Sequence, residues 1–262
     1  MTAGRRIEYR GFGVAFDAAG GRRVQALQGV DLIIPQGQFV CVVGRSGGGK
    51  STLVRALAGL VPATAGALTV DDAPVSGPGA DRVMVFQEDT VFPWLRVLDN
   101  VEFGLRNKGM SHDARRQLAR RWLSAVGLAG VERAWPKELS GGMRKRVALA
   151  TAFATGAGIL IMDEPFGALD FVTRATLQAV LLALWREAGS TIVFVTHDID
   201  EALVLGDRIL VVSEGRLRDD LACGMARPRN ADVRSSPAAV EITKTIVRRL
   251  DFRLEASAEP LG

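Results

Sequence analysis

The sequence predicts an α/β protein built on a mainly parallel β-sheet with helices on both faces. One observation is a set of continuously apolar runs, FVCVVG (39–44), GILIMDEP (158–165) and STIVFVTHD (190–198), which end in glycine or polar residues. Strands of this kind are buried on both faces, as in parallel sheets covered by helices. A second observation is the helical periodicity of residues 90–155, which lie between two predicted strands. Ligands of such sheets bind beyond the carboxyl ends of the strands, so the polar residues there are the first candidates for a site.

Length and composition suit a globular protein. The chain has 262 residues, of which 48% are hydrophobic and 24% are charged, enough for one large domain or two closely packed subdomains. The net charge of +4 is compatible with nucleic acid, an anionic membrane surface or an ordinary solvated face. No run approaches the ~18 apolar residues of a membrane span, and we expect neither such a span nor a signal peptide.

The two cysteines indicate no disulfide framework and no metal-ligand spacing, which fits a reducing compartment. Cys41 lies in a predicted buried strand and is expected to be a packing residue. Cys223 lies in a polar segment and carries no indication of a role.

Residues 25–44 alternate in polarity and then run apolar, as strands do ahead of a phosphate-binding loop. The following segment GRSGGGKST (44–52) contains G-x-x-x-x-G-K-[ST] between a strand and a helix, the context that this motif requires. Backbone N–H groups of the glycine-rich loop would point at phosphate oxygens, Lys50 would reach the β- and γ-phosphates, and the Ser51 hydroxyl would hold Mg²⁺. The predicted nucleotide-binding residues of the loop are Gly44, Arg45, Ser46, Gly47, Gly48, Gly49, Lys50, Ser51 and Thr52.

Gln87 ends the next predicted strand, in VMVFQED. An amide at that position could reach both Mg²⁺ and an attacking water. The helical segment that follows includes LARRWL (118–123), which we interpret as a solvated helix face, with basic contacts to a partner as the alternative. His112 is interpreted as a surface residue.

The helical segment ends with LSGGMRKRVALA (139–150), a second pattern suited to phosphate. Ser140 is a favourable helix N-cap, and Gly141 and Gly142 leave backbone N–H groups open to an approaching anion. One chain therefore carries two sequence patterns shaped for phosphate.

Two acidic residues follow the buried strand ILIM. Asp163 would hold Mg²⁺ through its water shell, and Glu164 is placed to orient or deprotonate an attacking water. The alternative is an acidic pair that caps the next helix, and the phosphate loop upstream favours the catalytic interpretation. His197, in VTHD, closes a third strand, and a contact with the γ-phosphate is favoured over a packing role.

The order and spacing of these motifs resemble the ATP-binding cassette (ABC) ATPases, the energising subunits of ABC transporters, over nearly all of residues 5–225. The matching features are the P-loop 44–51, Gln87, the signature LSGGM (139–143), LIMDE (160–164), GALD (167–170) and His197. The signature is the most specific of these because other P-loop families lack it. ATP and Mg²⁺ are therefore the expected cofactors.

The resemblance implies a P-loop NTPase (RecA-like) fold with an N-terminal antiparallel β subdomain and an inserted α-helical subdomain at about residues 90–155. The expected division is an ABC ATPase domain over 1–225 and a short C-terminal helical tail over 226–262. Within that tail, AVEITKTIVRRLDFRLE (239–255) predicts a final amphipathic helix that packs on its own domain.

The resemblance also implies a head-to-tail homodimer in which the signature of one subunit closes on ATP held by the other. Ser140, Gly141 and Gly142 would then contact the partner's γ-phosphate with help from the helix dipole. Asp170 would couple the two pockets. Phe16 occupies the place of the family's adenine-stacking aromatic, usually tyrosine, and the alternative is a core phenylalanine.

Two features depart from the family pattern or refine it. Met143 replaces the usual signature glutamine but leaves the Ser-Gly-Gly contacts in place, so we expect activity to survive. LSGGMRKR, PFGALD and residues 85–105, which include Pro93-Trp94, resemble the branch that serves nitrate, taurine and aliphatic sulfonate importers. Trp94 is either a core residue or part of a groove, at about residues 88–103, that receives a permease helix.

This branch implies an ATP-hydrolysing subunit that energises import of a small anionic solute. Its partners would be two integral-membrane permease subunits and, indirectly, an extracytoplasmic solute-binding protein, with the chain peripheral on the cytoplasmic face of the inner membrane. An exporter or lipid-transport cassette shares the catalytic residues, so it remains an alternative. A soluble ABC ATPase acting on ribosomes or DNA is less favoured, and no nucleic-acid partner is expected, because no basic-aromatic surface stands out.

Overall fold

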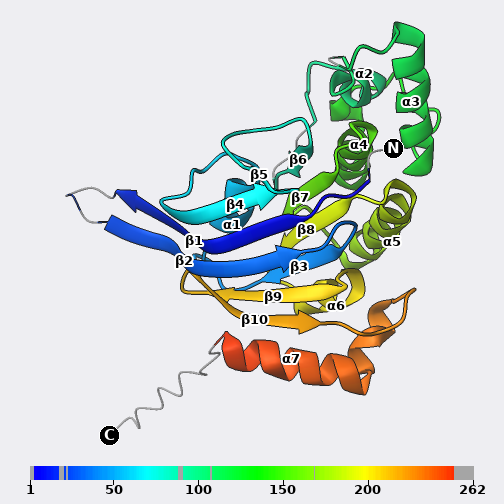
Figure 1. Cartoon of the computed structure of the whole chain (residues 1–262). Helices are drawn as coiled ribbons and strands as arrows, with labels where there is room; N and C mark the ends of the chain where they lie inside the picture. Colours follow the sequence, from blue (N-terminus) through cyan, green and yellow to red (C-terminus); the bar gives the residue numbers. More distant parts are fainter. Residues whose placement is uncertain are drawn as a thin grey trace, which may run out of the picture.

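The computed structural model describes residues 3–17, 21, 23–87, 91–106, 108–167 and 169–250 (Figure 1). This part of the chain contains an antiparallel sheet of order β2-β1-β4-β5 and a second sheet of order β10-β9-β3-β8-β7-β6. The antiparallel sheet consists of β1 (Ile7–Asp17), β2 (Arg23–Ile34), β4 (Ala65–Val70) and β5 (Ala73–Pro74). The second sheet consists of β3 (Phe39–Val43), β6 (Arg82–Val85), β7 (Ile159–Asp163), β8 (Thr191–Thr196), β9 (Arg208–Ser213) and β10 (Arg216–Ala222).

The second sheet is parallel except at its edge, where β10 pairs antiparallel with β9. Strand β3 explains why its sequence is continuously apolar. Val40 and Val42 pack in the core on the side of the antiparallel sheet, whereas Phe39, Cys41 and Val43 pack in the core on the opposite face. The strand is thus buried on both faces, and the prediction that Cys41 is a packing residue is confirmed.

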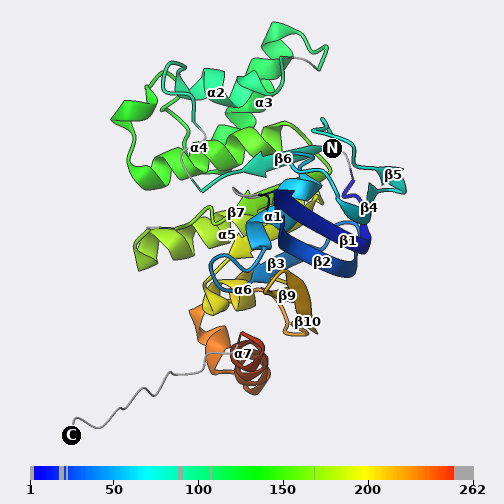
Figure 2. The ribbon, with the colours of Figure 1, turned by 90° about the vertical axis from the view of Figure 1, so that its left-hand side faces the viewer.

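The helices fall into three groups (Figures 1 and 2). Helices α1 (Lys50–Leu57), α5 (Phe171–Ala188) and α6 (Ile199–Leu205) lie against the parallel sheet. Helices α2 (Val97–Phe103), α3 (His112–Ala125) and α4 (Gly141–Ala154), with the 3₁₀ turn η1 (Pro136–Glu138), form a separate group beyond β6. The turn η2 (Ala231–Ser235) and helix α7 (Pro237–Arg249) lie at the opposite end, beside β10.

The helical group corresponds to the predicted insert at about residues 90–155. Its helix α3 is amphipathic: Ala119, Trp122 and Leu123 are buried, whereas Arg120 and Arg121 are exposed. Trp122 stacks on Phe153 of α4 with 5.7 Å between ring centroids, so burial of the aromatic faces holds the two helices together. The basic part of LARRWL is therefore the solvated face that the sequence predicted.

The final helix is also present, since α7 covers most of the predicted segment, and residues 251–255 of that prediction lie outside the described residues. Ala239, Ile246 and Leu250 join the same core as the main sheet. The division at residue 225 stays a prediction, because the tail shares this core. Cys223, for which the sequence carried no indication of a role, is 2% exposed and packs within that core.

Among the described residues, no helix is long and apolar enough to cross a membrane.

Candidate nucleotide-binding site

The phosphate-binding loop connects the end of β3 to the start of α1. Two of its glycines are required by the backbone: a Cβ on Gly44 would lie 2.0 Å from the carbonyl oxygen of Val212, and Gly49 has a φ of +106°. The first hydrogen bond of helix α1 runs from the Leu53 N–H to the Gly49 carbonyl, at 2.9 Å. The N–H groups of the first helical turn precede that bond and remain available to an anion.

Lys50 begins the helix and lies across this loop. Its side chain is buried, and Nζ donates to the carbonyl oxygens of Gly44 at 2.8 Å and Arg45 at 3.1 Å. Burial lowers the pKa of Lys50, whereas the nearby carboxylates of Glu164 and Asp163 raise it. The ammonium group is thus placed at the mouth of the loop, where phosphate oxygens would take over from the carbonyl acceptors.

Ser51 and Asp163 meet although they are 112 residues apart in sequence. The Ser51 hydroxyl donates to Oδ1 of Asp163 at 3.2 Å, at the point where α1 begins and β7 ends. Burial raises the pKa of Asp163, and the Ser51 hydrogen bond opposes that effect. A hydroxyl and a carboxylate side by side suit Mg²⁺, which takes oxygen ligands and completes its shell with phosphate oxygens and water.

Glu164 and His197 form a second pair at the same edge of the sheet. Strands β7 and β8 are parallel, with Asp163 opposite Val195, so their carboxyl ends coincide. Oε2 of Glu164 lies 3.0 Å from Nδ1 of His197. Glu164 has a φ of +48°, a left-handed conformation that is uncommon for a non-glycine residue and strains the backbone there.

Hydrogen bonds on both sides hold Glu164 in this conformation. Its N–H donates to the Val195 carbonyl at 3.0 Å, and its carbonyl accepts from the Gly167 N–H at 3.2 Å. A small cavity of about 40 Å³ is lined by Glu164, His197 and neighbouring residues that include Phe166. This volume has room for at least one water, beside a carboxylate that could accept its proton.

Gln87 follows β6 and lies at the turn after Glu164, because a Cβ on Gly167 would be 3.5 Å from Gln87 Nε2. Lys145 of α4 donates to the backbone carbonyl of Gln87 at 2.7 Å, which ties the helical group to this position. Within the described residues, the Gln87 amide makes no hydrogen bond with Ser51 or Asp163. Its predicted contact with Mg²⁺ therefore stays a prediction.

Ser140 starts α4 as the sequence predicted. Its hydroxyl accepts from the Met143 N–H at 3.2 Å, and the first helical bond runs from the Arg144 N–H to the Ser140 carbonyl at 3.0 Å. The N–H groups of Gly141 and Gly142 precede that bond, and Ser140 and Gly141 are exposed. This second phosphate-shaped helix start belongs to the helical group, whereas the P-loop belongs to the core of the main sheet (Figure 1).

A family model described as ABC transporter matches residues 27–167, more than half of the chain. The chain belongs to the ABC transporter ATPase family.

Similar proteins agree with this assignment. The chain is 46% identical over 224 residues to the aliphatic sulfonates import ATP-binding protein SsuB of Escherichia coli K12, covering 85% of this chain and 86% of the relative. It is 45% identical over 232 residues to the taurine import ATP-binding protein TauB of Burkholderia thailandensis, covering 86% and 89%. Among solved structures, the dimeric post-hydrolysis state of the ATP-binding cassette MJ0796 bound to ADP and Pi matches with a TM-score of 0.73 and 30% identity, covering 84% of this chain and all of that one.

These matches bear out the predicted family, fold and ATPase activity. The fold is that of an ABC cassette, with an antiparallel sheet, a mostly parallel sheet and a helical insert. The individual site residues are placed by the structure, and their roles in this ABC ATPase are proposals.

Asp170 of the ABC ATPase is the N-cap of α5, where its carboxylate accepts from the Thr173 N–H at 2.9 Å. A hydrogen bond with the Thr173 side chain lowers the pKa of Asp170 most, and the bond from the Thr173 N–H adds to this effect. A Cβ on Gly142 would lie 2.9 Å from Thr173 Cγ2, so the start of α4 packs close to the start of α5. The signature and the GALD segment are thus neighbours within one subunit.

Phe16 stands near the end of β1, opposite Val24 of β2, and is 46% exposed. This exposure contradicts the alternative of a core phenylalanine. Its contact with adenine stays a prediction.

Sequence reasoning missed Arg174 and Asp198. Arg174 Nη1 lies 2.8 Å from Asp198 Oδ2, and its other amino group donates to the Leu169 carbonyl at 3.2 Å. The signal that could have found them is their place in the sequence: Asp198 follows His197, and Arg174 is one helical turn after Asp170.

Proposed function

We propose that this chain is the ATP-hydrolysing subunit of a membrane importer for a small anionic solute of the aliphatic sulfonate, taurine or nitrate type. The observation that carries the proposal is the convergence of Lys50, the Ser51–Asp163 pair and the Glu164–His197 pair at one edge of the parallel sheet. The solute class is supported by relatives whose names include aliphatic sulfonate import and taurine import. The chain itself acts on ATP, and the solute would pass through its partners.

In hydrolysis, the P-loop backbone and Lys50 would bind the β- and γ-phosphates. Ser51 and Asp163 would hold Mg²⁺, which when bound neutralises charge on the phosphates. Glu164 would orient the attacking water and accept its proton, and His197 would contact the γ-phosphate while its Nδ1 stays close to Glu164. Gln87 is placed at the turn after Glu164 and would complete this arrangement.

The second phosphate-shaped helix start makes sense in a head-to-tail homodimer. Ser140, Gly141 and Gly142 would contact the γ-phosphate that the partner holds, with the dipole of α4 favouring the negative charge. Phe16 would stack on adenine, and Asp170 would couple the two composite pockets. Dimeric structures among the neighbours support this arrangement.

An apolar groove next to Gln87 is the proposed permease contact. It has a volume of about 380 Å³ and is lined by side chains that include Phe86, Phe92 and Phe103. Trp94 is 69% exposed, which contradicts the core alternative for this residue. Its ring centroid lies 5.5 Å from that of Phe92, so it extends the same apolar surface. We propose that the occupant is a short cytoplasmic helix of an integral-membrane permease, with this chain peripheral on the cytoplasmic face.

The test is affinity purification of the tagged, full-length protein from gently solubilised membranes of its native host, with identification of co-purified proteins by mass spectrometry. We expect a polytopic permease, and a solute-binding protein that binds sulfonates, taurine or nitrate. Trp94→Ala should lose the permease and keep ATP binding, whereas Leu60→Ala, an exposed apolar residue elsewhere, should keep both.

Other outcomes would separate the parts of the proposal. Co-purification of ribosomes, nucleic acid or an envelope lipid complex would overturn the importer assignment and leave the ATPase chemistry intact. Retention of the permease by Trp94→Ala would remove the groove from the docking role.

A further inference from the structure

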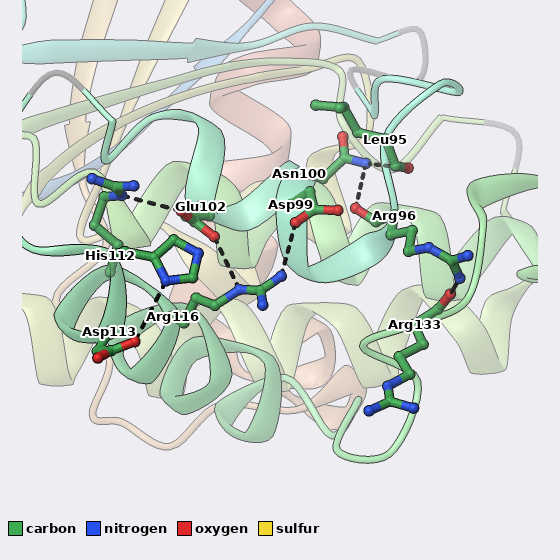
Figure 3. A network of polar contacts seen from close by, with 10 residues as sticks. Leu95, Arg96, Asp99, Asn100, Glu102, His112, Asp113, Arg116 and Arg133 are labelled. Carbon is green, nitrogen blue, oxygen red and sulfur yellow. Dashed lines mark hydrogen bonds and ion pairs between the residues drawn. The ribbon is translucent and has the colours of Figure 1, made fainter.

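A polar pocket in the helical group is separate from the nucleotide site. Its volume is about 430 Å³, and it lies between the start of α2, helix α3 and the loop that precedes η1. Four arginines line it, together with two carboxylates. They are Arg96, Arg116, Arg120, Arg133, Asp99 and Glu132. Figure 3 shows Arg96, Asp99, Arg116 and Arg133 around this region.

The arginines come from three separate segments of the chain. Arg96 precedes α2, Arg116 and Arg120 are one turn apart on α3, and Arg133 lies in the loop before η1. Residues four apart on a helix share one face, so Arg116 and Arg120 both face the pocket. The walls therefore carry four guanidinium groups against two carboxylates.

Two of the four arginines are already engaged. Arg116 pairs with Asp99 at 3.3 Å and with Glu102 at 3.5 Å (Figure 3). Arg96 donates to the carbonyl oxygen of Arg133, and its guanidinium carbon lies 4.6 Å from the centroid of the Trp135 ring. These contacts fix the two guanidinium groups in place at the wall.

Arg120 and Arg133 are different, because neither has a carboxylate within ion-pair distance in the part of the chain that the structure describes. Glu132 is near both, but its Oε1 accepts from the Gly130 N–H at 3.1 Å. Hydrogen bonds from its own N–H and that of Gly130 lower the pKa of Glu132, with smaller contributions from the charges of Arg120 and Arg133. Two exposed guanidinium groups, neither in an ion pair within the described part of the chain, thus stand at the mouth of a polar pocket.

Guanidinium groups bind tetrahedral oxyanions through pairs of parallel N–H groups, and such bonds are among the strong ones in proteins. We infer that the Arg120–Arg133 pocket binds a free, doubly charged oxyanion such as sulfate or phosphate. Arg120 and Arg133 would bind the anion, and Arg96, held by the Arg133 carbonyl and by Trp135, would add a third positive group.

The pocket also adjoins the segment that carries Trp94. The Asn100 side chain accepts from the Phe92 N–H at 2.7 Å and donates to the carbonyls of Leu95 at 3.0 Å and Arg96 at 3.1 Å. Arg96 therefore belongs both to the pocket wall and to the segment proposed to contact the permease. An anion bound beside Arg96 would stiffen this segment; this consequence rests on the proposed function, whereas the binding site does not.

The test is calorimetric titration of the full-length protein with sodium sulfate at constant ionic strength. Sulfate also suits the P-loop, so the titration is done in a Lys50→Ala background and repeated with wild-type protein saturated with ADP. We expect in both a saturable sulfate site that depends on Arg120 and Arg133. The double substitution Arg120→Ala and Arg133→Ala should weaken this binding at least about tenfold, because it removes two charge-assisted contacts.

The matched control is Arg121→Ala with Arg218→Ala, which removes the same charge from two exposed pairs with Glu187 and Glu214. It should leave sulfate binding unchanged. If the first double variant does not fold, as judged by thermal unfolding, Arg120→Gln alone carries the test, since Arg120 is exposed on α3. Equal binding by the test and control variants, or no saturable binding in the Lys50→Ala background, would overturn the site.

A second arm distinguishes a free anion from a lipid headgroup. Vesicles of phosphatidylcholine with and without phosphatidic acid are sedimented with wild-type protein and with both double variants. No binding specific to phosphatidic acid supports the free anion. Vesicle binding that Arg120→Ala with Arg133→Ala abolishes, without any sulfate binding in solution, would overturn the free anion in favour of a lipid phosphate. These results do not depend on ATP hydrolysis, so failure of the pocket and failure of the proposed function can be told apart.

Discussion

The guanidinium of Arg174 lies 2.8 Å from the carboxylate of Asp198 and joins helix α5 to the residue that follows His197. Arg174 also donates to the Leu169 carbonyl at 3.2 Å, next to Asp170. Asp198 in turn caps α6 by accepting from the Glu201 N–H at 3.1 Å. One side chain thus links the segment proposed to couple the two ATP sites to the segment that holds the histidine.

Arg174→Ala should lower kcat about tenfold and leave the Kd for ATP unchanged, because Arg174 positions His197 without contacting nucleotide in the proposed site. Arg174→Lys should recover part of the rate, since lysine keeps the positive charge but lacks the planar guanidinium that bonds both Asp198 and the Leu169 carbonyl. Steady-state hydrolysis and ATP titration separate the two effects. A loss of ATP affinity with unchanged kcat would contradict the positioning role.

Glu164→Gln should bind ATP, hydrolyse it about a hundredfold or more slowly, and accumulate as a dimer on a sizing column. The amide cannot accept the proton of the attacking water, whereas ATP contacts at the P-loop are unaffected. Glu241→Gln, on an exposed face of α7, is the control for a lost carboxylate. Normal turnover of Glu164→Gln would remove this residue from the role of base.

Ser140→Arg should keep ATP binding and lower turnover about a hundredfold, because the bulky side chain would block the approach of the α4 start to the partner's phosphate. Ser111→Arg is the matched control. Ser111 caps α3 by accepting from the Ala114 N–H at 3.3 Å, so this variant also loses a helix N-cap. Single-turnover and steady-state assays measure both. If Ser140→Arg hydrolyses ATP as fast as Ser111→Arg, the start of α4 does not complete the ATP site of the partner subunit.

Glu201→Gln should make the protein more stable than wild type at neutral pH. Glu201 is 5% exposed, and burial raises its pKa, with hydrogen bonds from Thr196 and Gln178 opposing that effect. Because folding raises the pKa of the Glu201 carboxyl, its favourable contribution to the free energy of unfolding is complete below the pKa of the unfolded chain. That contribution is lost as pH rises through the pKa of the folded protein. The gain in unfolding free energy should therefore be smallest below about pH 4, where the carboxyl is protonated in both states, and should grow as pH rises through the folded-state pKa. Urea unfolding of both proteins at several pH values measures it, and a gain that is equal at all pH values would contradict the prediction.

Features that depend on neighbouring residues could be predicted from the sequence. The P-loop and the Ser140 helix start are of this kind, because glycine conformations, N-caps and unpaired N–H groups at a helix start are properties of a few consecutive residues. The buried strands were predictable for a similar reason, since burial on both faces leaves a continuous apolar run, as in Phe39–Val43.

Contacts between distant residues needed the tertiary structure. Ser51 and Asp163 meet across 112 residues, and Glu164 and His197 meet across 33. Both contacts arise because β3, β8 and β7 are neighbouring parallel strands whose carboxyl ends lie at one edge. The exposure of Trp94 and the burial of Cys223 were equally undecided, because both depend on what else packs nearby. The residues of the Arg120–Arg133 pocket come from three segments, and only the packing of α3 against α2 and the following loop places their charges together.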